Sequence, residues 1–378
     1  MRRSSLSLPR VAVIGGGAIG LASAWALARA GARVTVLEAG PEAGQGALAA
    51  SGGMLAQGFE GANENAGRAF VALAAQSLDL WDEWAEQLNP YAETPLGYRR
   101  TGSLVPAVTQ ADQGWISALA ESSARHGIIF ERLDAAQARE HEPHLSPEVL
   151  SALRFPGDGE VDNRALGRAL AGAVRAAGGD IRTGWPVMRV SPDAAGVTVT
   201  GPAGVFTCDR VVLAAGWQSA ALAEDIPEAA SIMPVKGQMI SLQPVVDLSG
   251  CIRAARAYLS AKPGRIVVGA TSTANRSDDR ADDAATRTLC RHAGALVPAL
   301  AGAAVTDVWT GVRPGTFDGL PLIGPSACRG VILGLGAYRN GVLLAPAMAD
   351  LIRNAVLGEA DIDAAFDPQR PLTALTQG

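Results

Sequence analysis

The chain has 378 residues, of which 48% are hydrophobic and 18% are charged, and its formal net charge is −5. This length allows two domains or one large composite domain, and the negative charge argues against a nucleic-acid-binding protein. The apolar stretches, such as residues 342–348, are too short to cross a bilayer, so we expect no membrane span.

The first element of the chain predicts a dinucleotide-binding unit. Residues 11–14 are an apolar run typical of a buried parallel strand, and residues 1–9 before it are expected to form a frayed tail. The run leads into Gly15-Gly16-Gly17-Ala18-Ile19-Gly20, then into a helical pattern, and a second strand ends at Glu38. In this motif the first glycine permits the turn, the second lets the backbone approach a pyrophosphate, and the third lets helix and sheet pack closely. The acid accepts hydrogen bonds from ribose hydroxyls, so the unit predicts a site for NAD or FAD, between which the motif does not decide.

The next segments predict a mixture of helices and strands. Residues 46–55 are rich in small side chains, which indicates either close contact with a flat ligand or a tight loop. Trp81 and Trp84 lie at core-facing spacing in a helical pattern, which favours packing over a binding role. The expected helices cover residues 64–88, 112–126 and 135–141, and the expected strands cover residues 101–105 and 128–133.

The rest of the chain returns to helix and strand units and then becomes rich in strands. A helix is expected over residues 164–177, followed by strands at 187–190, 197–200, 205–208 and 210–216. Further strands are expected at 232–242, 252–259, 265–270 and 305–310, with one helix at 284–295 and a final helix that opens at 338–341 and runs to about 357. This order predicts an α/β protein in which a β-rich insert interrupts the nucleotide-binding part.

The cysteines and histidines give no sign of a metal site. The four cysteines lie far apart without CxxC spacing, which indicates reduced thiols in a cytoplasmic protein. His141 and His144 are the only close pair of histidines, and Pro143 between them argues against a shared helix face. We therefore predict no metal.

Short segments spread over nearly the whole chain resemble the D-amino-acid oxidase family of FAD flavoproteins, and most closely its glycine oxidases. Their number and order make a chance match implausible. The matching segments are Val-Ile-Gly-Gly-Gly-Ala-Ile-Gly20, Ala-Ser-Gly-Gly-Met-Leu55, Gly-Asp-Gly-Glu-Val-Asp162, Val-Val-Leu-Ala-Ala-Gly216, Pro-Val-Lys-Gly-Gln238, Arg-Ile-Val-Val-Gly-Ala-Thr271, Gly-Val-Arg-Pro-Gly-Thr316, Asp-Gly-Leu-Pro-Leu-Ile-Gly324 and Tyr-Arg-Asn-Gly-Val-Leu-Leu-Ala-Pro346.

The resemblance implies a Rossmann-like FAD-binding domain with an inserted β-rich (α+β) substrate domain. The FAD-binding domain would comprise residues 10–90, 151–225 and 309–378, and the substrate domain residues 91–150 and 226–308. FAD would be bound non-covalently, because Trp309 to Val312 stands where some relatives carry a flavin-linked cysteine.

The family pattern assigns the cofactor contacts to several separate regions of the chain. The glycine motif and Glu38 would hold the ADP half, and the start of the last helix would favour the electron-rich edge of the flavin. The implied cofactor residues are Gly15, Gly17, Ala18, Ile19, Gly20, Glu38, Ala50, Ser51, Gly53, Met54, Val187, Ala215, Gly216, Trp217, Arg339, Asn340, Gly341, Val342 and Leu343.

Three residues are implied for substrate binding and catalysis. Arg313 matches the arginine that pairs with the substrate carboxylate, with a structural ion pair as the alternative. Tyr258 matches the aromatic hydroxyl that assists it, with core packing as the alternative, and Arg339 would face phosphate or solvent or line the pocket entrance. Two departures, Ala337 in place of His and Ser260-Ala261 in place of Val-Pro, are expected near the substrate pocket.

The implied activity is FAD-dependent oxidative deamination of small amino acids such as glycine, sarcosine and small D-amino acids. The motifs contain no His, Ser–His or carboxylate pair suited to acid–base catalysis, which agrees with oxidation by hydride loss from the α-carbon. Molecular oxygen would be the acceptor, the assembly a homo-oligomer (dimer or tetramer), and the product an imine for thiamine thiazole synthesis. Two alternatives are a D-amino-acid or hydroxyproline dehydrogenase with another acceptor and a non-catalytic dinucleotide-binding regulator.

Overall fold

The computed structural model describes residues 8–62, 67–359 and 361–371. Most of the expected tail and the expected helix start at Glu64 lie outside these ranges. In the described part, no helix is long and apolar enough to cross a membrane.

A six-stranded sheet forms the first half of the molecule, and its centre is parallel as the apolar runs predict. Its order is β19-β20-β12-β1-β2-β8, in which only β19 runs antiparallel to its neighbour. The strands are β1 (Arg10–Ile14), β2 (Arg33–Leu37), β8 (Asp180–Arg182), β12 (Arg210–Leu213), β19 (Leu322–Pro325) and β20 (Val331–Leu335).

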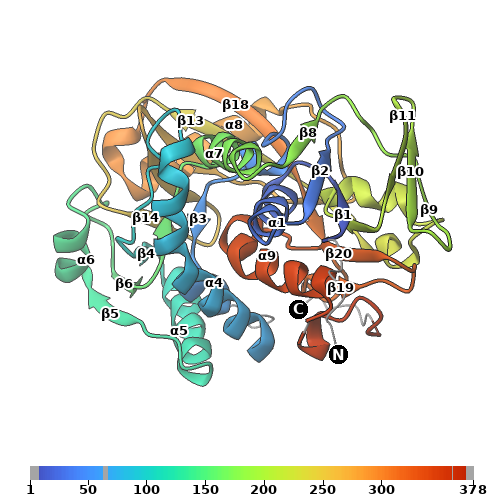
Figure 1. The fold of residues 1–378 in the computed structure, drawn as a ribbon. Helices are drawn as coiled ribbons and strands as arrows, with labels where there is room; N and C mark the ends of the chain where they lie inside the picture. Colours follow the sequence, from blue (N-terminus) through green and yellow to red (C-terminus); the bar gives the residue numbers. More distant parts are fainter. Residues whose placement is uncertain (1–7, 63–66, 360, 372–378) are drawn as a thin grey trace.

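The two faces of this sheet are covered by different layers. On one face, Val11 and Val13 pack with the helices α1 (Ala18–Arg29), α4 (Gly67–Leu88), α7 (Asn163–Ala176) and α9 (Gly341–Leu357). These helices are labelled in Figure 1. On the other face, Ala12 and Ile14 pack with a small antiparallel sheet of β9 (Arg189–Pro192), β10 (Val197–Gly201) and β11 (Gly204–Cys208). Alternate residues of β1 thus enter opposite cores, as the side-chain period of a strand requires.

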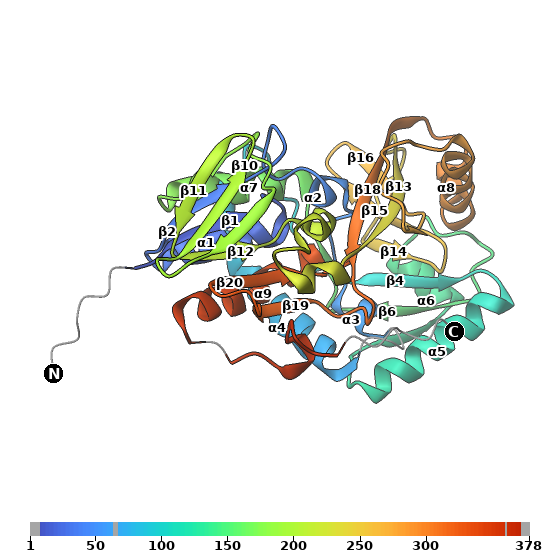
Figure 2. The ribbon, with the colours of Figure 1, turned by 90° about the vertical axis from the view of Figure 1, so that its right-hand side faces the viewer.

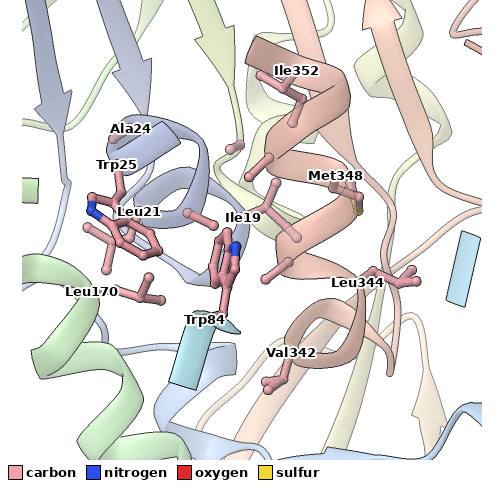
Figure 3. Close-up of a cluster of buried hydrophobic side chains, with 14 of the residues drawn as sticks. Ile19, Leu21, Ala24, Trp25, Trp84, Leu170, Val342, Leu344, Met348 and Ile352 are labelled. Atoms are coloured by element: carbon pink, nitrogen blue, oxygen red, sulfur yellow. The ribbon is translucent and has the colours of Figure 1, made fainter. Parts of the chain in front are cut away.

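The helical core joins the start of the chain to its end. Figure 3 shows Trp25 of α1 beside Trp84 of α4, with Leu344, Met348 and Ile352 of α9 in the same cluster. The two indole rings meet edge to face, with centroids 5.0 Å apart. The prediction that Trp81 and Trp84 are core residues is confirmed, since both are buried.

A nine-stranded mixed sheet forms the second half and lies beside the first in Figure 2. Its main order is β17-β13-β16-β15-β14-β4-β6-β5, and β18 pairs with β13. The strands are β4 (Ser103–Ala107), β5 (Glu131–Asp134), β6 (Ser151–Phe155), β13 (Met233–Leu242), β14 (Cys251–Arg253), β15 (Tyr258–Lys262), β16 (Arg265–Gly269), β17 (Thr273–Ala274) and β18 (Val305–Gly315). Leu104 and Val105 enter separate cores on its two faces, one with α6 (Ala135–His141) and α8 (Asp283–Leu296), the other with α5 (Gln110–Arg125).

The remaining elements of the described chain are short. They are α2 (Ala47–Ala50), β3 (Met54–Leu55), α3 (Gln57–Gly61) and β7 (Gly159–Glu160), together with the 3-10 turns Asn89–Tyr91, Gly216–Leu222, Pro227–Ser231, Pro298–Leu300 and Ala364–Phe366. The strands β3 and β7 pair with each other as a separate two-stranded sheet.

The structure corrects several expected strands. The strand expected over residues 252–259 is two strands, β14 and β15, because a turn closed by the Ala254 amide on the Ala257 carbonyl reverses the chain. The strands expected at 128–133 and 187–190 begin at Glu131 and Arg189, and the strand expected at 305–310 continues to Gly315 because β13 pairs with it along its length.

The mixed α/β class and the Rossmann-like sheet are confirmed. The domain boundaries stay a proposal, and two strands bear on them. β6 opens the segment assigned to the FAD-binding domain at 151 but pairs with β4 and β5 of the nine-stranded sheet. β18 crosses the proposed boundary between 308 and 309.

Candidate active site

One cavity of about 900 Å³ runs between the two large sheets. Its lining comes from the turn before α1, the end of β2, residues 45–56, the end of β12, the turn between β14 and β15, part of β18 and residues 334–342. This volume lies near the upper end of the range for ligand sites, roughly 300–1,000 Å³. Both halves of the fold are therefore needed to build it.

The glycine turn has the geometry that its motif predicts. Gly15 has φ of +103°, and a Cβ there would lie 2.6 Å from the Ala214 carbonyl oxygen. A Cβ on Gly20 would overlap the Gly15 carbonyl oxygen, so this glycine is required for the contact between helix and strand. A Cβ on Gly17 would meet nothing within 4 Å, and this residue lines the cavity. The α1 amides behind Gly17 thus form an open cradle suited to a pyrophosphate.

Glu38 lies beside this cradle and is held by two backbone amides. Gly16 donates to its Oε2 at 2.6 Å, and Gly40 donates to its Oε1 at 2.7 Å. A carboxylate offers about four acceptor positions, so capacity remains for ribose hydroxyls. The residues at this end of the cavity therefore fit the adenosine diphosphate part of FAD.

The small-residue segment predicted to contact the flavin is pinned from two sides. The Trp309 indole of β18 donates to the Ala50 carbonyl at 3.0 Å. The Val161 amide donates to the Gly53 carbonyl at 2.8 Å. Ala50, Ser51, Gly53 and Met54 all line the cavity.

Most of the other predicted cofactor residues also line the cavity, and two do not. The additional lining residues from the predicted set are Ala18, Ile19, Val187, Ala215, Gly216, Trp217, Arg339, Asn340, Gly341 and Val342. Gly20 is behind the cradle, where it serves packing. Leu343 is buried in the helical core, and its carbonyl accepts hydrogen bonds from Ser77 and Trp81.

Arg313 lies on β18 with its guanidinium in the cavity wall. Its Nη1 donates to the Thr271 carbonyl at 3.3 Å, and no carboxylate of the described residues lies within 4.0 Å of it. Both Nη atoms lie close to Gly237 on the neighbouring strand, where a Cβ would be 2.5 Å away. Burial lowers the pKa of Arg313, because the cation has lost water without gaining an anionic partner. The geometry favours a site for a carboxylate over the alternative of a structural ion pair.

Tyr258 reaches the same cavity from β15. Its ring packs between Gly52 and Gly269, where a Cβ on either glycine would overlap it. Burial raises the pKa of the phenol to about 12, so the hydroxyl stays protonated and can donate a hydrogen bond at neutral pH. The structure brings Tyr258 and Arg313 together as two donors on one cavity.

Arg339 belongs to a charged cluster that the sequence analysis missed. Its Nη2 lies 3.5 Å from Oε2 of Glu60, while Arg253 donates to Oε1 of Glu60 at 2.5 Å. Burial alone would raise the pKa of Glu60, but the charges of Arg339 and Arg253 outweigh it and hold the pKa below its ordinary value. The Arg253 guanidinium also stacks on Phe59, with 3.8 Å between Cζ and the ring centroid. Little in the sequence indicates that Glu60 is a site residue, because it is one acid among small residues.

Asp158 positions the short helix that carries Glu60. Its Oδ1 accepts from the Gly58 amide at 2.6 Å, and its Oδ2 accepts from Phe59 and from the Ser103 hydroxyl. Burial raises the pKa of Asp158 to about 6, although these hydrogen bonds act in the opposite direction. The matched Gly-Asp-Gly-Glu-Val-Asp segment therefore supports the site from behind.

The two sequence departures have different places in the structure. Ala337 lines the cavity as expected. Ser260 and Ala261 do not line it, although Tyr258 of the same strand does. Ser260 instead donates to the buried carboxylate of Glu160, which also contacts Lys262. No histidine lines the cavity, and the described residues hold no cluster of three or more His, Cys, Asp or Glu side chains suited to a metal.

Comparisons with known proteins agree with this arrangement. The family described as FAD dependent oxidoreductase (DAO) matches residues 10–355. Glycine oxidase from Geobacillus kaustophilus is 33% identical over 364 residues, which cover 92% of each chain. The bifunctional protein ThiO/ThiG from Synechocystis is 35% identical over 96% of this chain, which spans only 54% of that protein. The crystal structure of the Geobacillus kaustophilus glycine oxidase matches with a TM-score of 0.88 at 31% identity and covers 97% of this chain and 100% of the other.

Proposed function

The chain belongs to the DAO family of FAD-dependent oxidoreductases, and since it is an FAD-dependent amino acid oxidase acting on a CH–NH₂ group, we propose that it deaminates small amino acids. The proposed substrates are glycine, sarcosine and small D-amino acids. The products would be an imino acid or 2-oxo acid, ammonia or an amine, and hydrogen peroxide. The half-buried Arg313, with no carboxylate of the described residues within 4.0 Å and with Tyr258 on the same cavity, is the observation that carries this proposal.

In the proposed reaction the protein binds and orients, and FAD when bound supplies the acceptor for the two electrons. Arg313 holds the α-carboxylate through its planar fork, and Tyr258 donates a hydrogen bond to the same group. The cluster of Glu60 with Arg253 and Arg339 forms a fixed wall, because each charge has a partner. Two-point attachment of the carboxylate fixes the position of the α-carbon relative to the cavity wall.

The substrate amine would lose its proton to solvent rather than to a histidine. No histidine lines the cavity, and only a neutral amine has the lone pair that forms the imine as hydride leaves. Replacing each histidine should therefore lower the rate of flavin reduction little. A collapse of that rate in one histidine variant with intact FAD binding would overturn this step.

Anaerobic flavin bleaching tests the function directly. The purified protein should be yellow, and acid should release all its flavin as FAD because no cysteine stands at Trp309 to Val312. Glycine, sarcosine or D-alanine should bleach the flavin in the absence of oxygen, and admitting air should restore the colour with peroxide. Failure of all three substrates, together with a panel of other small amino and imino acids, would refute the proposal.

The alternative dehydrogenase would bleach with substrate but form no peroxide in air. We also infer from the resemblance to glycine oxidases a role in thiamine thiazole synthesis, a cytoplasmic location and a dimer or tetramer. Thiamine dependence of a deletion strain tests the first of these, cell fractionation the second, and light scattering the third.

A further inference from the structure

The charges that line the cavity are strongly unequal. The acidic lining residues are Glu38 and Glu60, and the basic ones are Arg253, Arg256, Arg313 and Arg339. Glu38 belongs to the nucleotide end, where the backbone amides of Gly16 and Gly40 hold it. Among the residues that the structure describes, the rest of the cavity is therefore lined by four arginines and one acid.

In the described part of the chain, two of these four arginines pair with Glu60, and the other two have no carboxylate partner. Glu60 pairs with Arg253 and Arg339. No carboxylate in the described ranges lies within 4.0 Å of Arg313 or Arg256. A substrate with one carboxylate would pair with Arg313 and leave Arg256 unmatched, in a cavity that still has excess positive charge.

Arg256 has a defined place at the cavity rim. It lies in the turn between β14 and β15, which the hydrogen bond from the Ala254 amide to the Ala257 carbonyl closes at 2.8 Å. Tyr258 follows two residues later on β15 and enters the same cavity. The Arg256 residue is exposed, unlike buried Arg253, so it can meet an incoming ligand without first leaving a protein partner.

We propose that the preferred substrate is a small amino acid with a second carboxylate, which Arg256 binds while Arg313 holds the α-carboxylate. This inference rests on the proposed amino acid oxidation. A second anion offsets the remaining positive charge, and the cationic rim raises the rate of its encounter with the site. A substrate with an uncharged group in place of the second carboxylate would leave the N–H donors of Arg256 to solvent.

Two pairs of compounds isolate the second carboxylate. D-Aspartate differs from D-alanine by this group, and iminodiacetate differs from sarcosine in the same way. We expect at least one dicarboxylate to have an apparent dissociation constant in anaerobic flavin reduction about tenfold lower than its partner, as one partly exposed charge-assisted contact allows. Raising the salt concentration should reduce this preference.

Matched variants assign the preference to Arg256. In Arg256→Gln the ratio between dicarboxylate and monocarboxylate should fall to about one. The control Arg287→Gln removes an exposed arginine of α8 that does not line the cavity, and it should keep the ratio of the parent. An equal loss of preference in the control would mean that general surface charge, not the rim contact, produces it, and would overturn the assignment.

Binding of unreactive anions separates this inference from the proposed function. Malonate and acetate are titrated against the flavin-loaded protein, and the change in the flavin absorption spectrum reports their binding. Tighter binding of malonate in the parent but not in Arg256→Gln supports the second site even if no amino acid reduces the flavin. If glycine or D-alanine reduces the flavin while both dicarboxylates and malonate show no advantage, the oxidase function stands and this inference is refuted.

Discussion

Removing the guanidinium of Arg313 should weaken substrate binding without weakening the fold. In the described structure this group has one hydrogen bond, to the Thr271 carbonyl, and no carboxylate partner. Replacing it by Ala removes a half-buried cation whose loss of water lowers its pKa, because the nearby charges, Glu60 among them, offset that loss only in part. The melting temperature of Arg313→Ala should therefore equal or exceed that of the parent, and its FAD content should be unchanged.

The expected loss follows from the two hydrogen bonds of an arginine fork. A charge-assisted pair of this kind contributes about 1.5–3 kcal/mol, which corresponds to roughly ten- to a few-hundredfold in the dissociation constant. Arg313→Lys should lose much of this contribution too, because an ammonium does not reproduce the planar fork.

The neighbouring strand offers a variant that keeps the charge and changes only its position. A Cβ on Gly237 would lie 2.5 Å from both Nη atoms of Arg313, so Gly237→Ala must displace the fork. We expect a loss of binding of about tenfold, in the lower part of the range for Arg313→Ala. Comparing Arg313→Ala with Gly237→Ala therefore separates the effect of losing the cation from the effect of displacing it.

The assay is anaerobic flavin reduction as a function of amino acid concentration, with a simple amine that lacks the carboxylate as the control substrate. Parent and variants should differ for the amino acid and agree for the amine. If Arg313→Ala binds the amino acid as tightly as the parent does, the carboxylate site is elsewhere, and Arg339 becomes the next candidate.

Four further changes have distinct expected outcomes. Gly17→Ala should fold normally yet bind FAD at least about tenfold more weakly in titrations of the apoprotein, because its Cβ would project into the open cradle. Gly20→Ala should instead lose stability by several kcal/mol or fail to fold, since its Cβ would overlap the Gly15 backbone; a stable variant would contradict this packing argument. Tyr258→Phe should lose about 1 kcal/mol of substrate binding, and an unchanged dissociation constant would assign the ring to packing alone. The raised folded-state pKa of Asp158, about 6 against 3.8, adds stability that is present at low pH and lost as pH rises through 6. As the pH is lowered from about 7 to about 5, the free energy of unfolding of the parent, measured in urea, should thus rise by about 1 kcal/mol relative to that of Asp158→Asn. The same pH dependence in both proteins would refute this role of Asp158.

Local sequence was sufficient for the nucleotide end of the site. The roles of Gly15, Gly17 and Gly20 depend on a strand, a turn and a helix that follow one another directly. Close backbone contacts within such a unit require glycine at fixed spacing. The glycine motif can therefore be identified without knowledge of the rest of the fold. The predicted boundaries of the long helices were also close to the observed ones, because apolar residues that recur at helical spacing identify a buried helix face.

Strand ends were less predictable, since hydrophobicity does not report where a chain reverses. Residues 252–259 are almost uniformly compatible with a strand, and only the hydrogen bond between Ala254 and Ala257 reveals the turn. That turn places Arg256 on the rim of the cavity. The hydrogen bond of Ser260 was similarly not predictable, because its buried partner Glu160 lies a hundred residues away in sequence.

The chain's motifs by themselves determined the family, the cofactor unit and the arginine expected to bind a carboxylate. Only the tertiary structure brought Glu60 between Arg253 and Arg339 and set Arg313 against Gly237. These groups come from α3, β14, the segment before α9 and the paired strands β13 and β18. No periodicity in the sequence relates such distant segments. The packing of the two sheets therefore decides which charges are paired and which can bind a ligand.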